Sequence, residues 1–200
     1  MSFKKLLIKF SLILIVFFVF IGKSFSLEPE EFVQSVVNQA SSILTKNYTK
    51  EQKIEKLKSI AEEAVDIKGI GYYCLGAHRK NLSDDKKKEY LDIFKKYFLK
   101  SFSSRLAEYT DPKIRVDSKK KLNEKYTMVS SVLLATKEKP EVKIDWRIVT
   151  KNPDKPLIID VVIEGVSLAK VQKEEFNSII QSNNGNIDAL LISLKEFINR

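Results

Sequence analysis

The hydrophobic pattern of this 200-residue chain changes its period at Asp111-Pro112, and that change limits the folds the chain can adopt. Before this point, apolar residues recur every three or four positions, which is the spacing of one face of a helix. After it, apolar and polar residues alternate, as they do in strands that bury one face. Helical spacing returns near the end of the chain. Helices, then strands, then helices predict an α+β domain.

The segment before Pro112 is predicted to be helical. Apolar stripes run from Glu31 to Leu44 and, after a short break, from Ile54 to Val65. Asp66 to Leu75 contains glycines among apolar residues, which predicts a short helix or an irregular segment. Ser83 can cap a long helix from Lys86 to Tyr109. The aromatic residues of this helix fall on nearly one side: Tyr90, Phe94, Tyr97, Phe98, Phe102 and Tyr109.

Four strands are predicted after Pro112. They are Lys113 to Ser118, Glu124 to Thr136, Glu141 to Thr150 and Leu157 to Glu164. Short turns separate them, beginning with the Lys-rich segment Lys119 to Asn123, so the strands should form an antiparallel meander. The third strand alternates most clearly, which predicts one buried face. Its apolar side carries Val142, Ile144, Trp146 and Ile148, and the apolar set of the last strand is Leu157, Ile159, Val161 and Ile163.

The stretch from Asp160 to Phe176 joins the last strand to a helix. A β-branched run ends at Glu164-Gly165, where glycine permits a sharp change of direction. Ser167 can then cap the helix by accepting a backbone N–H of its first turn. A final helix is predicted from Ile187 to Ile198.

This stretch, DVVIEGVSL followed downstream by Phe176, resembles a segment of the MlaC family of periplasmic phospholipid-binding proteins, also called the toluene-tolerance family. The resemblance extends from about Phe32 to Phe197 and is most specific around Trp146 and Asp160 to Phe176. It implies a nuclear-transport-factor-like cone, in which a curved antiparallel sheet of about four strands is covered by N-terminal and C-terminal helices. It also implies that the long aromatic helix lies across the open side of the sheet. The family usually has Trp-Arg where this chain has Ala77-His78-Arg79.

The amino terminus has the pattern of an export signal. Three lysines precede an apolar run from Phe10 to Gly22, and Ser24-Phe25-Ser26 offers small residues to a signal peptidase. The pattern predicts a signal peptide at residues 1–26, and the family resemblance implies a single phospholipid-binding domain at residues 27–200. The alternative is an uncleaved membrane anchor, because the longer run from Leu6 to Ile21, interrupted only by Lys9 and Ser11, is near the lower length limit for a spanning helix. Cleavage is favoured because no stop-transfer charge cluster follows the run.

Charge and cysteine content limit the classes of partner. Removal of residues 1–26 leaves 31 basic and 26 acidic residues, a net charge of +5. The charges alternate in sign along the predicted helices, as on a solvated surface, and leave open a moderate attraction to anionic membranes. No basic cluster is interleaved with stacking aromatics, so we expect no nucleic-acid partner. Cys74 has no second cysteine to pair with in the chain and is expected to be buried.

The sequence contains no clear catalytic or metal-binding constellation. His78 is the only histidine, which excludes a histidine-rich metal site. Asp145, Asp160 and Glu164 can approach one another on adjacent strands, but surface ion pairing explains them more simply. A phosphate loop, a Cys-x-x-Cys pair and a dinucleotide fingerprint are all missing from the sequence. We therefore expect no catalytic residue, no metal and no cofactor.

A binding site for long apolar ligands is the best positive interpretation. The aromatic helix and the alternating strands can present apolar groups to one interior, although an ordinary packed core is the simpler explanation of such stripes. The residues expected to line a lipid site are Phe94, Phe98, Phe102, Ile144, Trp146, Ile148, Val161, Ile163 and Val166.

The family resemblance implies a periplasmic shuttle that carries phospholipid between outer-membrane and inner-membrane complexes and so maintains the lipid asymmetry of the outer membrane. The acyl chains would be buried and the head group exposed. The implied partners are an outer-membrane lipoprotein with its porin and an inner-membrane ABC transporter. Two alternatives stay open: an exported cone-fold enzyme acting on a small apolar substrate, and an interaction module without a ligand.

Overall fold

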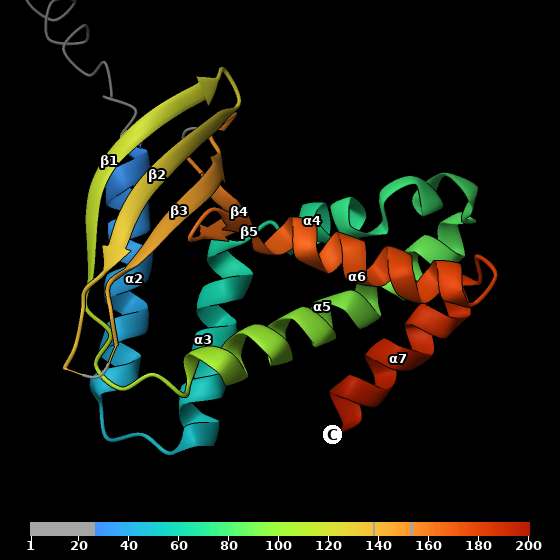
Figure 1. Ribbon diagram of the computed structural model, residues 1–200, viewed down its shortest axis with the longest axis horizontal. Coiled ribbons are helices and arrows are strands. Elements are labelled where there is room, and N and C mark those ends of the chain that lie inside the picture. The colour runs from blue at the N-terminus through green and yellow to red at the C-terminus, as the bar shows by residue number, and fades with distance from the viewer. Residues whose placement is uncertain (1–26, 138, 153) are drawn as a thin grey trace, which may run out of the picture.

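The computed structural model describes residues 27–137, 139–152 and 154–200, and the predicted signal peptide lies outside this part of the chain. The described residues form six α-helices and one five-stranded antiparallel sheet (Figure 1). Along the chain, four helices are followed by five strands and then by two helices. This arrangement confirms the α+β class predicted from the change of period.

All the described α-helices except the first begin at a residue whose side chain accepts a backbone N–H of the first turn. Thr49 and Gln52 form a capping box at the start of α3, in which each side chain accepts the other's backbone N–H. Ser83 accepts the N–H of Lys86 at the start of α5. The helices are α2 (Pro29–Thr45), α3 (Lys50–Ala64), α4 (Ile67–Leu75), α5 (Asp84–Leu106), α6 (Leu168–Ser182) and α7 (Ile187–Asn199), with a 3₁₀ turn, η1 (Gly76–Asn81), after α4.

The sheet is a meander in which each strand pairs with the next. The strands are β1 (Ile114–Asn123), β2 (Tyr126–Leu133), β3 (Val142–Val149), β4 (Leu157–Ile163) and β5 (Val166–Ser167). The prediction of a turn at Lys119–Asn123 is wrong, because Lys119 pairs with Val129 and Lys121 with Thr127. Lysines suit this position because β1 is an edge strand, where charge discourages pairing with other molecules. The short β5 is a fifth strand that the sequence pattern did not predict.

A β-bulge changes which residues of β4 are buried. The pairing moves from Arg147 with Asp160 to Ile148 with Ile158, so Ile159 is left as the extra residue. Ile158 is thus buried on the same side of the sheet as Val161, and Asp160 and Val162 are buried as well. The apolar set predicted from strict alternation, Leu157, Ile159, Val161 and Ile163, is only half-buried.

The sheet and the last four helices lie at opposite ends of the molecule, with α3 between them (Figure 1). Helix α2 packs on β1 and β2, whereas α4 and α6 pack on β4. Helix α5 packs instead on α3, α4 and α7. The family resemblance implied that the long helix lies across the open side of the sheet. This expectation is wrong, because α5 packs on other helices. Among the described residues, no helix combines the length and the apolar character needed to span a membrane.

Candidate functional site

Asp160 connects the sheet to the first turn of α6. Its side chain is only 7% exposed. One carboxylate oxygen accepts the backbone N–H of Ala169 at 3.0 Å, and the other accepts the hydroxyl of Ser167 at 2.6 Å and Nη1 of Arg147 at 3.1 Å. A negative charge is favourable at a helix amino terminus, where backbone N–H groups lack partners. Asp160 therefore fixes the direction in which α6 leaves the sheet.

The turn between β4 and β5 explains the Glu-Gly pair of the same segment. Glu164 and Gly165 have φ angles of 49° and 81°, and they link the paired residues Ile163 and Val166. Two positive φ angles in a two-residue loop are typical of the type I′ hairpin turn. Ser167 follows directly and accepts the N–H of Lys170 at 3.1 Å, which confirms its predicted capping role. The DVVIEGVSL segment is thus a structural corner.

The aromatic face of α5 belongs to an apolar cluster at the helical end of the molecule, called the helical cluster below. Phe94 is fully buried, and its ring lies 6.1 Å from that of Phe176 in an edge-on arrangement. Phe98 and Phe102 are half-buried and stack on each other with centroids 5.8 Å apart. The buried members are Ala61, Ile67, Ile70, Cys74, Leu75, Tyr90, Ile93, Phe94, Leu99, Phe176, Ile180, Leu190, Leu191 and Leu194.

A second apolar cluster, called the sheet cluster below, lies between the sheet and α2. Its buried members are Phe32, Val33, Val37, Ala64, Val129, Ile148 and Ile158. Trp146 and Val161 are half-buried and pack against it. The indole N–H of Trp146 donates to the hydroxyl of Ser131 at 2.9 Å, so its one polar atom is satisfied.

The nine residues predicted to line a lipid site are divided between these clusters. Phe94, Phe98 and Phe102 belong to the helical cluster or pack on it, and the sheet cluster holds Trp146, Ile148 and Val161 in the same way. Ile144 is buried, Ile163 is half-buried, and Val166 is 52% exposed on β5, each outside both clusters. Val65, at the end of α3, packs against both clusters. The two clusters therefore meet at Val65, and we call this contact the seam.

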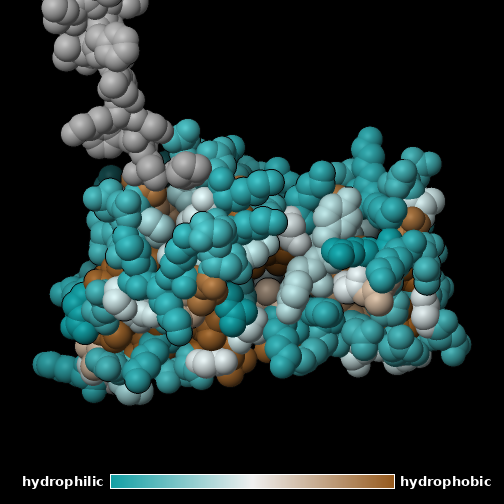
Figure 2. Space-filling model, turned by 90° about the horizontal axis from the view of Figure 1, so that it is seen from above, coloured by the Kyte–Doolittle hydropathy of each residue, from teal (hydrophilic) through white to brown (hydrophobic). Residues whose placement is uncertain are grey.

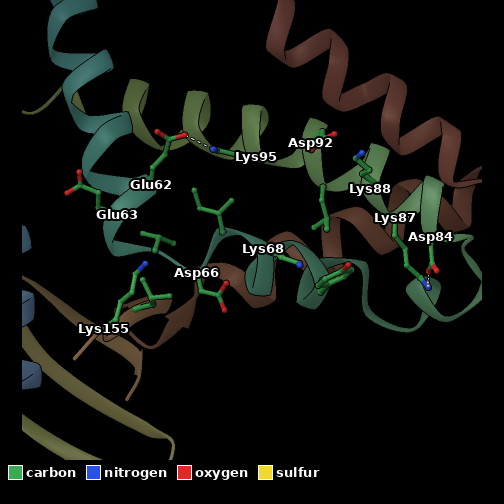
Figure 3. Close-up of a pocket in the computed structure, with 15 residues that line it drawn as sticks. Glu62, Glu63, Asp66, Lys68, Asp84, Lys87, Lys88, Asp92, Lys95 and Lys155 are labelled. Carbon is green, nitrogen blue, oxygen red and sulfur yellow. Dashed lines mark hydrogen bonds and ion pairs between the residues drawn. The ribbon is translucent and has the colours of Figure 1, made fainter. Parts of the chain in front are cut away.

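A groove of about 640 Å³ opens beside this seam, between α3, α4, α5 and the start of β4 (Figure 3). We call it the α3–α5 groove. Its apolar lining consists of Val65, Ile67, Tyr72, Leu91 and Leu157. In the view from above, hydrophilic residues cover most of the surface and hydrophobic residues lie in a recess near its middle (Figure 2). None of the nine predicted residues lines the α3–α5 groove.

The rim of the α3–α5 groove carries charges of both signs. Lys95 pairs with Glu62 at 2.7 Å, and Lys87 with Asp84 at 3.0 Å (Figure 3). Within the described part of the chain, the remaining rim lysines form no ion pair. They are Lys68, Lys88 and Lys155. An apolar floor beneath a rim of mobile charges suits an amphipathic molecule, whose polar end can stay in water.

Sequence reasoning missed the α3–α5 groove because its lining comes from residues far apart in the chain. Asp66 donates its backbone N–H to the carbonyl of Ile158 at 2.9 Å, and Val65 forms an isolated parallel bridge with Ile158. This contact brings the end of α3 to the start of β4. Leu91 lies beside the aromatic stripe of α5, and Leu157 belongs to the apolar set predicted for β4. No pattern within one element shows that both residues line one groove.

The carboxylates considered for catalysis are held by separate partners. Asp145 accepts the hydroxyl of Ser130 at 2.6 Å, whereas Glu164 accepts the backbone N–H of Lys143. Asp160 is committed to the first turn of α6. Across the described ranges, no three His, Cys, Asp or Glu side chains are grouped so that they could hold a metal ion.

Cys74 is buried, as the sequence predicted. Burial and the nearby Asp160 carboxylate raise the pKa of its thiol to about 12. The thiol therefore stays protonated at neutral pH and is a poor nucleophile.

Comparisons with known proteins show the family of the chain and a solved structure with a similar fold. A family model described as MlaC protein matches residues 34–196. The fold is similar to that of a phospholipid-binding protein from Ralstonia solanacearum, solved in complex with a phospholipid, with a TM-score of 0.70. The two chains are 18% identical, and the match covers 85% of this chain and 96% of the other. No curated protein matches the chain significantly.

Proposed function

Because the chain belongs to the MlaC family, we propose that it binds phospholipid and carries it through the periplasm between outer-membrane and inner-membrane complexes. The family match carries this proposal. It is supported by the shared fold of the Ralstonia solanacearum protein, which was solved with a phospholipid. In this role the protein helps to maintain the lipid asymmetry of the outer membrane.

The physical need for a carrier follows from the hydrophobic effect. A diacyl phospholipid has on the order of 30 methylene groups, and exposing each to water costs about 0.8 kcal/mol. The rate at which a phospholipid crosses an aqueous compartment without a carrier is therefore negligible. A carrier replaces water with an apolar surface around the chains, and this binding role requires no catalytic group.

The seam between the two clusters is the place in this fold where acyl chains can be held at the lowest cost. Residues that pack on the two clusters, such as Phe98, Trp146 and Val161, are only half-buried, so part of their apolar surface is still available to a ligand. Opening a fully buried contact would instead forfeit close packing. The head group then lies at the charged rim of the α3–α5 groove, in contact with water.

Export and partners complete the proposal. The predicted signal peptide at residues 1–26 directs the chain to the periplasm and is removed there. The partners are an outer-membrane lipoprotein with its porin, which supplies lipid, and an inner-membrane ABC transporter, which accepts it. This role involves binding and release without chemical change of the lipid.

A transfer experiment tests the carrier role. Donor vesicles with a labelled phospholipid and unlabelled acceptor vesicles are separated by a membrane that passes only protein. We expect the purified protein to move label to the acceptor vesicles, and mass spectrometry should find the lipid unchanged. As a control, protein unfolded by heat should move none.

Two outcomes would contradict the proposal. Conversion of the labelled lipid into a product would favour the alternative of an exported enzyme. A folded protein that moves no label and retains no lipid would favour an interaction module without a ligand.

A further inference from the structure

We propose that the tip of the β1–β2 hairpin docks the protein on an anionic phospholipid membrane. The tip, Ser118–Tyr126, contains four lysines and one glutamate. It also presents two apolar side chains, Leu122 and Tyr126, which are 44% and 37% exposed. This surface is separate from the α3–α5 groove, and the proposal does not rest on lipid transport, since a carrier can meet its membranes through partner proteins alone.

The tip is an ordered projection of the sheet. Every residue from Ser118 to Tyr126 is exposed, and the hairpin extends beyond the first turn of α2 (Figure 1). The side chain of Asn123 accepts the backbone N–H groups of Lys125 and Tyr126 at 2.9 and 3.1 Å, which holds the turn closed. The hairpin can therefore reach a flat surface without any rearrangement of the fold.

Two of the four tip lysines are free to bind another molecule. Lys119 contacts Glu28 and Glu30, and Lys121 contacts Glu124 at 2.8 Å. Lys120 and Lys125 form no ion pair with any residue in the described ranges.

A neighbouring loop adds positive charge to the tip. The backbone N–H of Thr150 donates to the carbonyl of Lys125 at 2.8 Å, so the β3–β4 loop lies beside the turn. Lys151 follows Thr150 in this loop and is exposed. This end of the sheet therefore carries Lys151 in addition to the tip lysines.

The combination of lysine, leucine and tyrosine favours a membrane over other anionic partners. Tyrosine is enriched at the level of lipid head groups, and lysine can bury its alkyl stem while its ammonium group contacts phosphate. Polybasic segments are attracted to anionic leaflets in the same way. A nucleic-acid surface would need more than one stacking aromatic, and Tyr126 is the only aromatic residue of the tip.

The chain also enters the fold beside this hairpin. Because Lys119 contacts Glu28 and Glu30, the first turn of α2 lies next to β1. In the sequence, the apolar run Phe10–Gly22 ends shortly before this turn. A chain held at a membrane by that run during export would be attached close to the hairpin.

Vesicle binding of the purified protein tests this proposal. We expect binding to vesicles of phosphatidylcholine with phosphatidylglycerol, weaker binding to phosphatidylcholine alone, and a decrease as salt is added. Lys120→Gln with Lys125→Gln should weaken binding to the anionic vesicles roughly 30-fold, because each lysine contributes a factor of about five. Leu122→Ser with Tyr126→Ser should also weaken it, and should do so at high salt as well.

Matched controls change the same properties elsewhere on the surface. Lys46→Gln with Lys96→Gln removes two exposed lysines far from the tip, and Ile192→Ser removes an aliphatic side chain that is 57% exposed on α7. Both should bind vesicles as the wild type does. Equal binding of the wild type to both kinds of vesicle, or equal losses in the tip and control variants, would overturn the proposal. Tighter binding to duplex DNA than to anionic vesicles would assign the tip to nucleic acid instead.

Discussion

At the scale of single residues, Asp160 shows how a buried charge can organise a fold. Its carboxylate is shared between a helix N-terminus, the capping serine and an arginine on the neighbouring strand. The arginine is 45% exposed, so water screens much of its attraction to the carboxylate. The N–H of Ala169 is buried, so water cannot replace the hydrogen bond that it donates to Asp160.

Substitution at Asp160 should separate these two contributions. Asp160→Ala should destabilise the fold by about 3 kcal/mol, because it leaves the Ala169 N–H without an acceptor. Asp160→Asn should cost less, since its carbonyl can still accept that N–H. Arg147→Gln should cost under about 1 kcal/mol. Chemical denaturation would measure all three, and equal losses for Arg147→Gln and Asp160→Ala would show that the ion pair matters more than the helix cap.

Gly165 should matter through its backbone conformation alone. Its φ angle is 81°, yet a Cβ atom added there would meet nothing within 4 Å. Gly165→Ala should therefore cost about 1 to 2 kcal/mol, and Gly165→Asn less, because Asn tolerates positive φ. Gly165→Val should reduce the stability at least as much as Gly165→Ala. Melting temperatures would check this order, and a wild-type value for the Val variant would show that the turn does not require glycine.

At the scale of elements, α5 should respond unevenly to truncation of its aromatic residues. Phe94 is enclosed by the helical cluster, so Phe94→Ala should cost roughly 3 to 5 kcal/mol through lost burial and a cavity. Phe98 is half-buried where it packs on the helical cluster, and Phe98→Ala should cost about half as much. Denaturation of lipid-free protein would measure both. A larger loss at Phe98 than at Phe94 would contradict this difference in burial.

An element can be predicted from the sequence where its pattern depends on local residues, and it is missed where it depends on pairing with another element. Helices α2, α3, α5 and α7 were predicted because their apolar periodicity is local, and Ser83 also marks the start of α5. The bulge that moves burial to Ile158 depends on pairing between β3 and β4, which no single strand encodes. The β1 segment Lys119–Asn123 was missed because its strand state depends on β2.

The candidate site was less predictable than the fold for a related reason. Periodicity identified the apolar faces that carry Phe94 and Trp146, but it does not show against which other elements these faces pack. The seam at Val65 depends on the contact between α3 and β4, whose partners are about ninety residues apart in the chain. Residues of the α3–α5 groove were therefore outside the reach of the sequence pattern.

At the scale of the whole molecule, two apolar clusters joined at a seam distinguish this fold from one with a single packed core. Because lipid is proposed to occupy the seam, enlarging a residue beside it should displace ligand instead of straining the protein. Val161→Trp adds volume next to the sheet cluster. In an ordinary core the same change would cost about 1 to 3 kcal/mol.

The central claim is tested most directly by the phospholipid that stays with the purified protein. Mass spectrometry of solvent extracts from wild type, Val161→Trp and the exposed control Ile192→Trp would measure it, with melting temperatures taken on the same samples. We predict phospholipid in the wild type and the control, and much less in Val161→Trp at a similar melting temperature. A folded wild type without phospholipid, together with loss of stability in Val161→Trp, would contradict the account.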